Sequence, residues 1–317
     1  MTNLISGLQL AKLEALNLPY DLSISTATIT CKINVMFNVL NIAHYFNDFD
    51  DIIIGKKYGN RVIKNLINFK KVKNGKKKKR KEKKNFFNQV SLIFRTATLM
   101  GIDPESLSLK EKFKNINVKL FINGSIQMTG CKHLDNINKS LEILFEKLKI
   151  TKAILNKNYI FEKKTFVTSI ENLDLLNVKI TNLDSVLNIK SNSVINQLNI
   201  NNVYLFEIRM INTNFNIGFQ INREILYQLL YDSGFDVTFD PIIHACVNIK
   251  YNMFDLNKTV SIFVFESGSI TIAGSNSCYQ ILIAYNFINK FILSNYNKLL
   301  SKPITPQLII ELINNII

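Results

Sequence analysis

Two stretches of the chain share the same order of apolar and polar positions. They are Phe121–Gly130 and Phe265–Gly274, at an offset of 144 (265 − 121). Each predicts an apolar strand, a tight turn and a second, alternating strand, because a period of two is typical of strands with one buried face. The dipeptide Asn123-Gly124 strengthens the first hairpin, since both central residues of this kind of turn take positive φ.

The two hairpins share residues as well as a pattern. Five pairs are identical: Phe121 with Phe265, Gly124 with Gly268, Ser125 with Ser269, Ile126 with Ile270, and Gly130 with Gly274. Each hairpin is followed by apolar residues at three- and four-residue spacing, which predicts helices over Leu134–Leu148 and Cys278–Phe291. One hairpin followed by a helix is common in α+β proteins. Two copies with the same residues favour an internal duplication.

A strand and a helix precede each hairpin. Ile24–Ile33 alternates and is rich in β-branched residues, which predicts a strand. Asn34 is suited to cap a helix over Val35–Phe46. In the second half, Phe206–Ile217 predicts a strand, and a helix over Arg223–Tyr231 follows.

The tripeptides before the two helices give a second offset between the repeats. Lys32–Asn34 and Gln220–Asn222 occupy equivalent places in the pattern, at an offset of 188 (220 − 32). Because the hairpins are offset by 144, the first repeat carries 44 extra residues (188 − 144) between these landmarks. We expect this excess to be an insertion.

Charge is concentrated inside that insertion. The net charge is +15, and Lys70–Lys84 alone has eleven Lys or Arg and one Glu, hence +10. The rest of the chain therefore shares about +5. Such a run fits a solvated, disordered insertion, a phosphate-binding arm or a nuclear-import signal, and its composition does not decide among the three.

Candidate catalytic or metal-binding chemistry is sparse. The chain has no nucleotide-binding Gly-x-x-x-x-Gly-Lys loop, no His-Glu-x-x-His and no Gly-x-Ser-x-Gly. The cysteines and histidines are scattered, at Cys31, Cys131, Cys246, Cys278, His44, His133 and His244. The acidic residues Asp48, Asp50 and Asp51 fit a polar turn. We therefore expect no enzyme activity, cofactor, metal site or disulfide framework. We also expect no secretory signal and no membrane span.

The duplicated pattern resembles the TATA-box-binding proteins. Ile24–Ile33 is similar to the family's first strand. The two hairpins are similar to its Leu-Ile-Phe-x-Ser-Gly-Lys-x-x-x-Thr-Gly-Ala-Lys signature, and Phe239–Pro241 to its Tyr-Glu-Pro. The resemblance implies an α+β fold in which two repeats form one saddle-shaped, curved antiparallel sheet with helices on the convex face.

The resemblance also implies a domain organisation. It gives an N-terminal extension (1–20), a first saddle repeat (21–153) with a Lys-rich insertion near 48–85, an inter-repeat insertion (154–203), a second saddle repeat (204–295) and a C-terminal extension (296–317).

In the family, a pair of phenylalanines in each repeat wedges between base steps and kinks the DNA. Phe121 and Phe265 match one member of each pair, and Phe87 matches the third. The fourth place falls on His244, which departs from the family and is expected to stack less well.

The concave face of the saddle is expected to contact the minor groove through small and β-branched side chains. The positions implied are Ile24, Thr26, Gln127, Thr129, Asn212, Thr271 and Ala273. Leu22 and Met210 stand where the family has two central asparagines, so their hydrogen-bond donors are lost. Lys132 and Lys250 keep phosphate contacts. Ser125, Ser269 and Asn276 replace family lysines.

The function implied is that of a general transcription initiation factor. It would bind and bend double-stranded, AT-rich promoter DNA in the minor groove and recruit RNA polymerase. A TFIIB-type factor would contact Asp240, Ile242 and Ile243. The expected location is the nucleus, or a viral replication compartment. The departures from the family leave an alternative open, a saddle that no longer reads DNA and serves as a protein interaction platform in a transcription assembly.

Overall fold

The computed structural model describes residues 18–59, 61–64, 87–99, 101, 115–132, 134–150, 152–155, 158, 161–168 and 193–300. These residues form two compact units, and each is described by itself. Unit 1 is built from residues within 28–207, and unit 2 from residues 18–27 and 208–300. Strands β1 (Ser23–Lys32) and β11 (Tyr204–Asn216) each contribute residues to both units.

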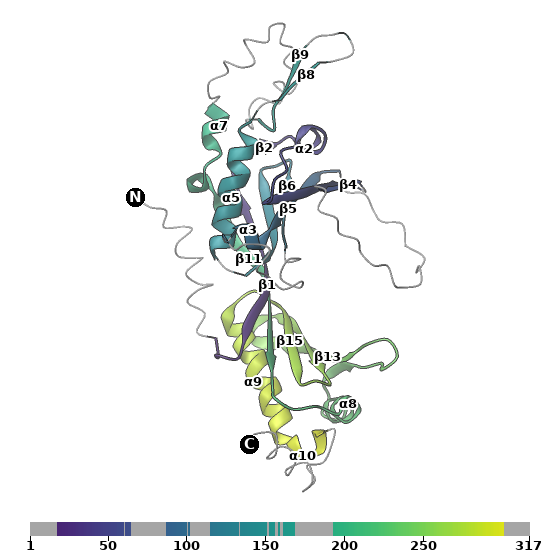
Figure 1. Cartoon of the computed structure of the whole chain (residues 1–317). Coiled ribbons are helices and arrows are strands. Elements are labelled where there is room, and N and C mark those ends of the chain that lie inside the picture. Colours follow the sequence, from purple (N-terminus) through teal and green to yellow (C-terminus); the bar gives the residue numbers. More distant parts are fainter. Residues whose placement is uncertain are drawn as a thin grey trace. The chain divides into compact units, whose positions relative to one another are not determined.

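Unit 2 is an antiparallel sheet with helices packed on one face (Figure 1). In chain order after β11 its elements are α8 (Arg223–Asp232), β12 (Asp236–Thr238), β13 (Cys246–Met253), the 3-10 helix η4 (Phe254–Leu256), β14 (Lys258–Phe265), β15 (Ser269–Ser275), α9 (Cys278–Ser294) and α10 (Tyr296–Leu299). The strand order is β12-β13-β14-β15-β11-β1.

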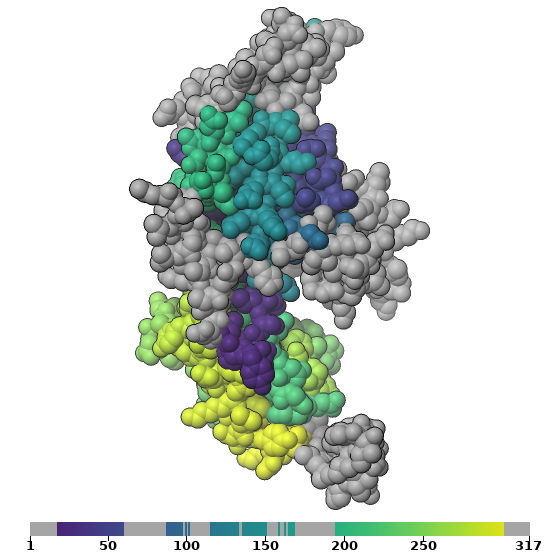
Figure 2. All heavy atoms as spheres, turned by 60° about the vertical axis from the view of Figure 1, so that its left-hand side comes forward, coloured from purple at the N-terminus to yellow at the C-terminus, as the bar shows by residue number. Residues whose placement is uncertain are grey.

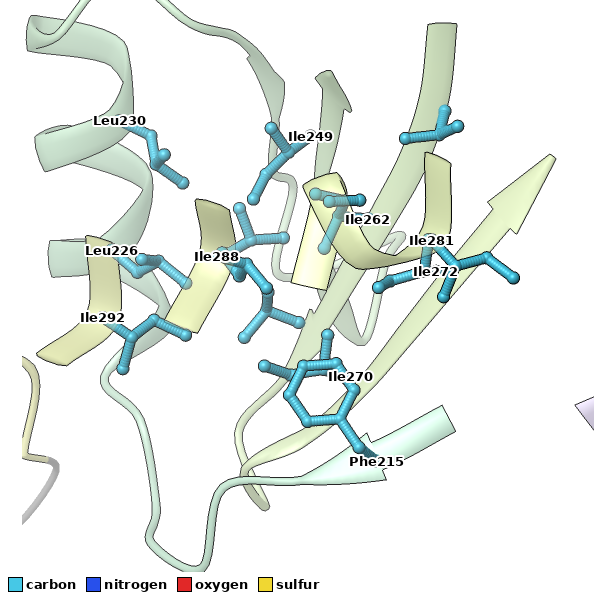
Figure 3. Close-up of a cluster of buried hydrophobic side chains, with 14 of the residues drawn as sticks. Phe215, Leu226, Leu230, Ile249, Ile262, Ile270, Ile272, Ile281, Ile288 and Ile292 are labelled. Carbon is cyan, nitrogen blue, oxygen red and sulfur yellow. The ribbon is translucent and has the colours of Figure 1, made fainter. Parts of the chain in front are cut away.

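The core of unit 2 lies between this sheet and its helices. Leu226 and Leu230 of α8 and Ile288 of α9 point toward Ile249 and Ile262 of the sheet (Figure 3). Along each strand every second residue is buried in this way, as a period of two requires. Each fully buried Leu or Ile side chain contributes about 1.5–3 kcal/mol.

Unit 1 repeats this arrangement of sheet and helices and also has further elements. In chain order after β1 its elements are β2 (Met36–Phe37), α2 (Val39–Tyr45), β3 (Ile53–Tyr58), β4 (Arg61–Lys64), β5 (Gln89–Arg95), α3 (Thr96–Leu99), β6 (Asn115–Phe121), β7 (Ser125–Cys131), α5 (Leu134–Leu148), β8 (Lys152–Leu155), β9 (Phe161–Lys164), β10 (Val167–Thr168), α7 (Ser193–Gln197) and the 3-10 helix η3 (Ile200–Asn202). The main sheet has the order β1-β7-β6-β5-β3-β4, and β10-β2 and β8-β9 form two small sheets.

Helix α5 covers the apolar face of this sheet. Its buried residues Leu141, Leu144 and Phe145 face the core, to which Val118 and Leu120 of β6 also contribute. The 3-10 helix η3, at the end of the expected inter-repeat insertion, contacts α5, and the two lie side by side at the surface (Figure 2).

Both predicted hairpins are present, and their turn glycines are required. Gly124 and Gly268 have φ of 78° and 77°. A Cβ on Gly124 would overlap the carbonyl oxygen of Val35, and one on Gly268 would overlap that of Phe219. Only glycine combines a left-handed φ with so close a backbone approach.

The backbone hydrogen bonds correct the register between the repeats. Ile33 N donates to Gly124 O, and Ile217 N donates to Gly268 O, both at 3.1 Å. Asn222 caps α8, whereas α2 is capped by Asn38 and not by Asn34. The offset is therefore 184 (217 − 33), and the excess in the first repeat is 40 residues (184 − 144).

Helix α2 also begins later than the sequence pattern predicts. Met36 and Phe37 are extended and pair with β10, and Phe37 N donates to Ile122 O at 3.2 Å. These contacts hold the segment before Asn38 in an extended conformation, so the helix covers Val39–Tyr45 and not Val35–Phe46.

Part of the segment between the two repeats supplies backbone hydrogen-bond partners to the first repeat. Asn38 N donates to Phe166 O at 2.8 Å, as Asn222 N donates to Leu299 O at 2.7 Å. Phe166 and Val167 therefore pair with the residues at the start of α2 in unit 1, as Leu299 and Leu300 pair with the residues at the start of α8 in unit 2.

The duplicated α+β fold predicted from the sequence is confirmed. The domain boundaries expected from the resemblance stay predictions. The Lys-rich run 70–84 lies outside the described residues, as do residues 1–17, 169–192 and 301–317. Within the described part of the chain, no helix has the length and apolar character needed to cross a membrane.

Candidate nucleic-acid interface

Each unit has one sheet face turned away from its helices, which we call the open face. It carries the strand residues that alternate with the buried core residues. In unit 1 the open face comprises Gln89, Ser91, Ile93, Asn117, Lys119, Phe121, Gln127 and Thr129. In unit 2 it comprises Asn212, Asn214, Cys246, Asn248, Lys250, Ser261, Phe263, Phe265, Thr271 and Ala273. All are partly or fully exposed.

The four expected wedges occupy equivalent places in the two units. Gln89 pairs with Phe121 across β5 and β6, and Phe87 lies two residues before Gln89. Cys246 pairs with Phe265 across β13 and β14, and His244 lies two residues before Cys246. The register thus places one pair of expected wedges near the same end of a strand pair in each unit.

The wedge side chains are accessible. Phe87 is 57% exposed, and its ring lies edge-on to Tyr58 with 5.5 Å between ring centroids. A Cβ on Gly59 would lie 2.8 Å from Cε1 of Phe87, so glycine is what permits this ring position. Phe121 and Phe265 are partly exposed, and His244 is exposed.

The expected partner-binding residues lie on a tight turn next to His244. Asp240 Oδ1 accepts from Ile242 N at 2.9 Å, and Asp240 O accepts from His244 N at 2.7 Å. The turn leaves Ile242 and Ile243 94% and 70% exposed. Apolar side chains so exposed are typical of contact surfaces.

The residues at β1 and β11 that were expected to contact DNA are at most partly exposed. Thr26 and Met210 are partly exposed, but Leu22 is buried in the unit 2 core and Ile24 packs against that core. The offset of 184 also makes Phe206, and not Met210, the equivalent of Leu22 (22 + 184). Phe206 is likewise buried.

Amide side chains that the sequence reasoning did not single out line the open face of unit 2. Asn214 pairs with Thr271, Thr271 with Phe263, and Phe263 with Asn248. The only available signal was their polar position within alternating strands, which is weak in a chain rich in asparagine. Asn212, which was expected at the site, is held by its Oδ1, which accepts from Gly274 N at 3.2 Å.

The lysines at the open faces differ in exposure and in their partners. Lys250 is exposed, and its Nζ donates to Ser261 Oγ at 2.7 Å. Lys132 is partly exposed directly after β7. Lys119 lies at the centre of the unit 1 open face, between Ser91 and Gln127, and forms no ion pair with a described residue.

Other ionisable groups serve the fold. Lys147 of α5 lies 2.9 Å from Asp48 and 3.0 Å from Asp50, which explains two of the three acidic residues near that turn. Burial raises the pKa of the Cys31 and Cys131 thiols to about 12, so neither forms a thiolate near neutral pH. Among the residues that can be described, no three His, Cys, Asp or Glu side chains gather as a metal site.

Comparison with known proteins identifies proteins that align with most of the chain. No family model matches. A TATA-box-binding protein-like protein of Acanthamoeba polyphaga mimivirus is 30% identical over 302 residues, which cover 92% of this chain and 70% of that protein. Among solved structures, the Methanococcus jannaschii TBP aligns with 86% of this chain and 99% of its own, at 13% identity and a TM-score of 0.44.

Proposed function

The chain belongs to the TATA-box-binding protein-like family, and from this premise we propose that it is a transcription factor that binds double-stranded DNA. More specifically, it acts in transcription initiation by binding AT-rich promoter duplex in the minor groove and bending it. The open faces contact the groove, and the paired wedges enter base steps.

The observation that carries this proposal is the repeated wedge register. Phe87 with Phe121 and His244 with Phe265 stand at matched positions of two independent strand pairs, with their side chains accessible. Core packing explains neither the exposure nor its repetition. Unstacking a base step costs a few kcal/mol, and a ring inserted there offsets that cost by stacking and by widening the contact.

The partner side of the proposal rests on the turn at Asp240. Ile242 and Ile243 stand beside a wedge, so a protein bound there would lie next to the bent DNA. We assign this turn to a TFIIB-type factor, which would bring RNA polymerase to the promoter. The site of action would be the nucleus or a viral replication compartment.

A second function is favoured by one specific observation. Leu22 and Phe206 stand at equivalent positions of the two repeats, and both are buried apolar residues. The centre of the sheet then offers no amide donor at these two places. The same fold would, on this reading, serve as a protein interaction platform in a transcription assembly.

Phenylalanine substitutions separate the two functions. Phe121→Ala and Phe265→Ala should each weaken binding to an AT-rich duplex about 10-fold or more, because a base–aromatic stack contributes ~1–3 kcal/mol. Both should also reduce the bend reported by end-to-end FRET.

Phe254→Ala is the matched control, since Phe254 is an exposed ring on the turn between β13 and β14. It should bind and bend DNA as the unaltered protein does. Unchanged affinity and bending in the Phe121 and Phe265 variants would remove the DNA-bending function and leave the platform.

A further inference from the structure

The two residues that follow the expected wedges of unit 2 are joined by one side chain. Arg223, the first residue of α8, donates from Nη1 to Ala245 O at 2.8 Å and from Nη2 to Glu266 Oε2 at 2.7 Å. Ala245 directly follows His244, and Glu266 directly follows Phe265. A single guanidinium group thus links the turn that carries His244 to the hairpin that carries Phe265.

Arg223 is itself held in place by the fold. Its Cζ atom lies 5.4 Å from the centroid of the Phe239 ring, and that ring packs against the core of unit 2. Its backbone begins α8 directly after the cap Asn222, whose N donates to Leu299 O at 2.7 Å. Arginine presents its donors in a planar, rigid fork, so it loses little freedom when it binds two partners at once. The link therefore ties both wedge segments to the helical layer of unit 2.

This link lies where the sheet no longer holds the wedge segments together. The ladder between β13 and β14 ends with the pair Cys246 and Phe265, so His244 stands two residues beyond the last pair. The turn before β13 is closed on itself, because Asp240 O accepts from His244 N at 2.7 Å. Strand pairing therefore does not fix the spacing between His244 and Phe265. Arg223 supplies the tie that the ladder lacks there.

Unit 1 carries apolar side chains at both places of this ion pair. The offsets of 184 and 144 make Val39, the first residue of α2, the equivalent of Arg223, and make Ile122 the equivalent of its acidic partner. Neither side chain can form a hydrogen bond. The wedge Phe87 is held instead by the ring of Tyr58, with 5.5 Å between ring centroids. The two units thus hold their wedges by different chemistry.

We propose that Arg223 is a positioning residue for DNA bending by unit 2, which sets the spacing of His244 and Phe265 before DNA is bound. It acts through the two segments that it joins and not through a contact with a phosphate. A wedge that is ordered in advance loses less freedom on binding, so more of the contact energy remains for opening the base step. The inference rests on the proposed function, because it presupposes that these two residues enter base steps.

The test follows the opening of each base step separately. The probe is 2-aminopurine, a fluorescent adenine analogue that brightens when it is unstacked, placed at one adenine at a time along an AT-rich duplex. The unaltered protein should brighten it at two places, and Phe265→Ala identifies the place opened by unit 2 because it abolishes that signal. Arg223→Gln should lose most of the signal at this place and keep the signal at the other. Its affinity should fall about 3- to 10-fold, because the wedge segments must then be ordered on binding.

Two further variants separate positioning from a direct contact with DNA. Glu266→Ala removes a negative charge, which by electrostatics alone should strengthen binding to DNA, yet it should reproduce the loss at the unit 2 place because Arg223 loses a partner. Arg223→Lys keeps the charge but not the fork, so it should stay impaired. Arg223→Gln should leave the slope of log affinity against log salt unchanged. Glu224→Gln, at the next, exposed residue of α8, is the control and should change neither signal.

The outcomes separate this inference from the proposed function. A full signal at the unit 2 place in Arg223→Gln or Glu266→Ala, or equal losses at both places, would overturn the inference and leave the proposed function standing. Full recovery in Arg223→Lys, together with a salt slope that falls by about 0.9 in Arg223→Gln, would also overturn it, because Arg223 would then contact a phosphate. Absence of brightening at every position with the unaltered protein would overturn both.

Discussion

The substitution Gly268→Ala probes the contact that fixes the unit 2 hairpin and the wedge Phe265 beside it. Gly268 has a φ of 77°, a conformation that costs an alanine about 1–2 kcal/mol. Its new Cβ would also overlap the Phe219 carbonyl oxygen, so the backbone must move. The bonds at risk are Ile217 N to Gly268 O (3.1 Å) and Ile221 N to Glu266 O (2.9 Å), worth about 1 kcal/mol each.

The expected loss is therefore about 3–4 kcal/mol in the free energy of unfolding, a large part of the roughly 5–15 kcal/mol of an ordinary domain. Gly218→Ala separates the two contributions, because Gly218 has a φ of 83° and nothing lies within 4 Å of its added Cβ. It should lose only the conformational part, about 1–2 kcal/mol.

Urea unfolding followed by circular dichroism measures both variants. Equal slopes of the unfolding free energy against urea concentration, in both variants and the unaltered protein, would establish that the same surface is exposed on unfolding. Equal losses for Gly218→Ala and Gly268→Ala would refute the close approach of Phe219 to the turn. Gly124→Ala with Gly101→Ala offers the same comparison in unit 1, where Gly101 also has open space.

Two further predictions concern lysines. Lys56 is 2% exposed, and burial lowers its pKa from 10.5 to about 8. Between these pH values the unfolded chain binds more protons than the folded one, so the free energy of unfolding rises with pH, by about 3 kcal/mol over the whole interval. Lys56→Met should lack this rise in urea titrations from pH 7 to 10, and parallel pH profiles of the two proteins would contradict the burial of Lys56. Lys250→Ala should reduce the slope of log affinity against log salt by about 0.9, which is the effect of one lost phosphate contact. Lys290→Ala, on the helical side, is the control and should leave the slope unchanged. Equal slopes for the two variants would remove Lys250 from the interface.

Local chemistry explains what the sequence could predict. The turn glycines Gly124 and Gly268 and the alternation around them fix each hairpin within a few residues, and the repetition of Phe121 at Phe265 reveals the duplication. Helix α8 was predicted over Arg223–Tyr231 from its apolar periodicity, and the structure shows that Asn222, directly before it, is its cap.

The register error shows where local chemistry is insufficient. Asn34 resembles a cap as closely as Asn38 does, and the choice is made by Phe166, whose carbonyl accepts from Asn38 N at 2.8 Å. That contact spans 128 residues (166 − 38), and no local pattern indicates it. Tertiary contact thus overrides the earlier helix signal.

The candidate site was predicted unevenly for the same reason. Phe121 and Phe265 belong to the hairpin motifs, so their places in the sheet could be predicted, while their role as wedges stays a prediction. Asn214 and Asn248 belong to different strands, and only the cross-strand pairing through Thr271 and Phe263 brings them into one row. Leu22 alternates as an open-face residue would, but it is buried by the core of unit 2.

The central claim is that the folded units, and not the basic run, read and bend DNA. The most direct measurement is anisotropy across a salt series on AT-rich and GC-rich duplexes, with end-to-end FRET, for the intact protein and for one lacking Lys70–Lys84. We predict AT-selective binding with a bend that survives the deletion. Unbent binding that is blind to sequence and vanishes with the run would contradict the claim, because counterion release at a basic segment then accounts for all of the affinity.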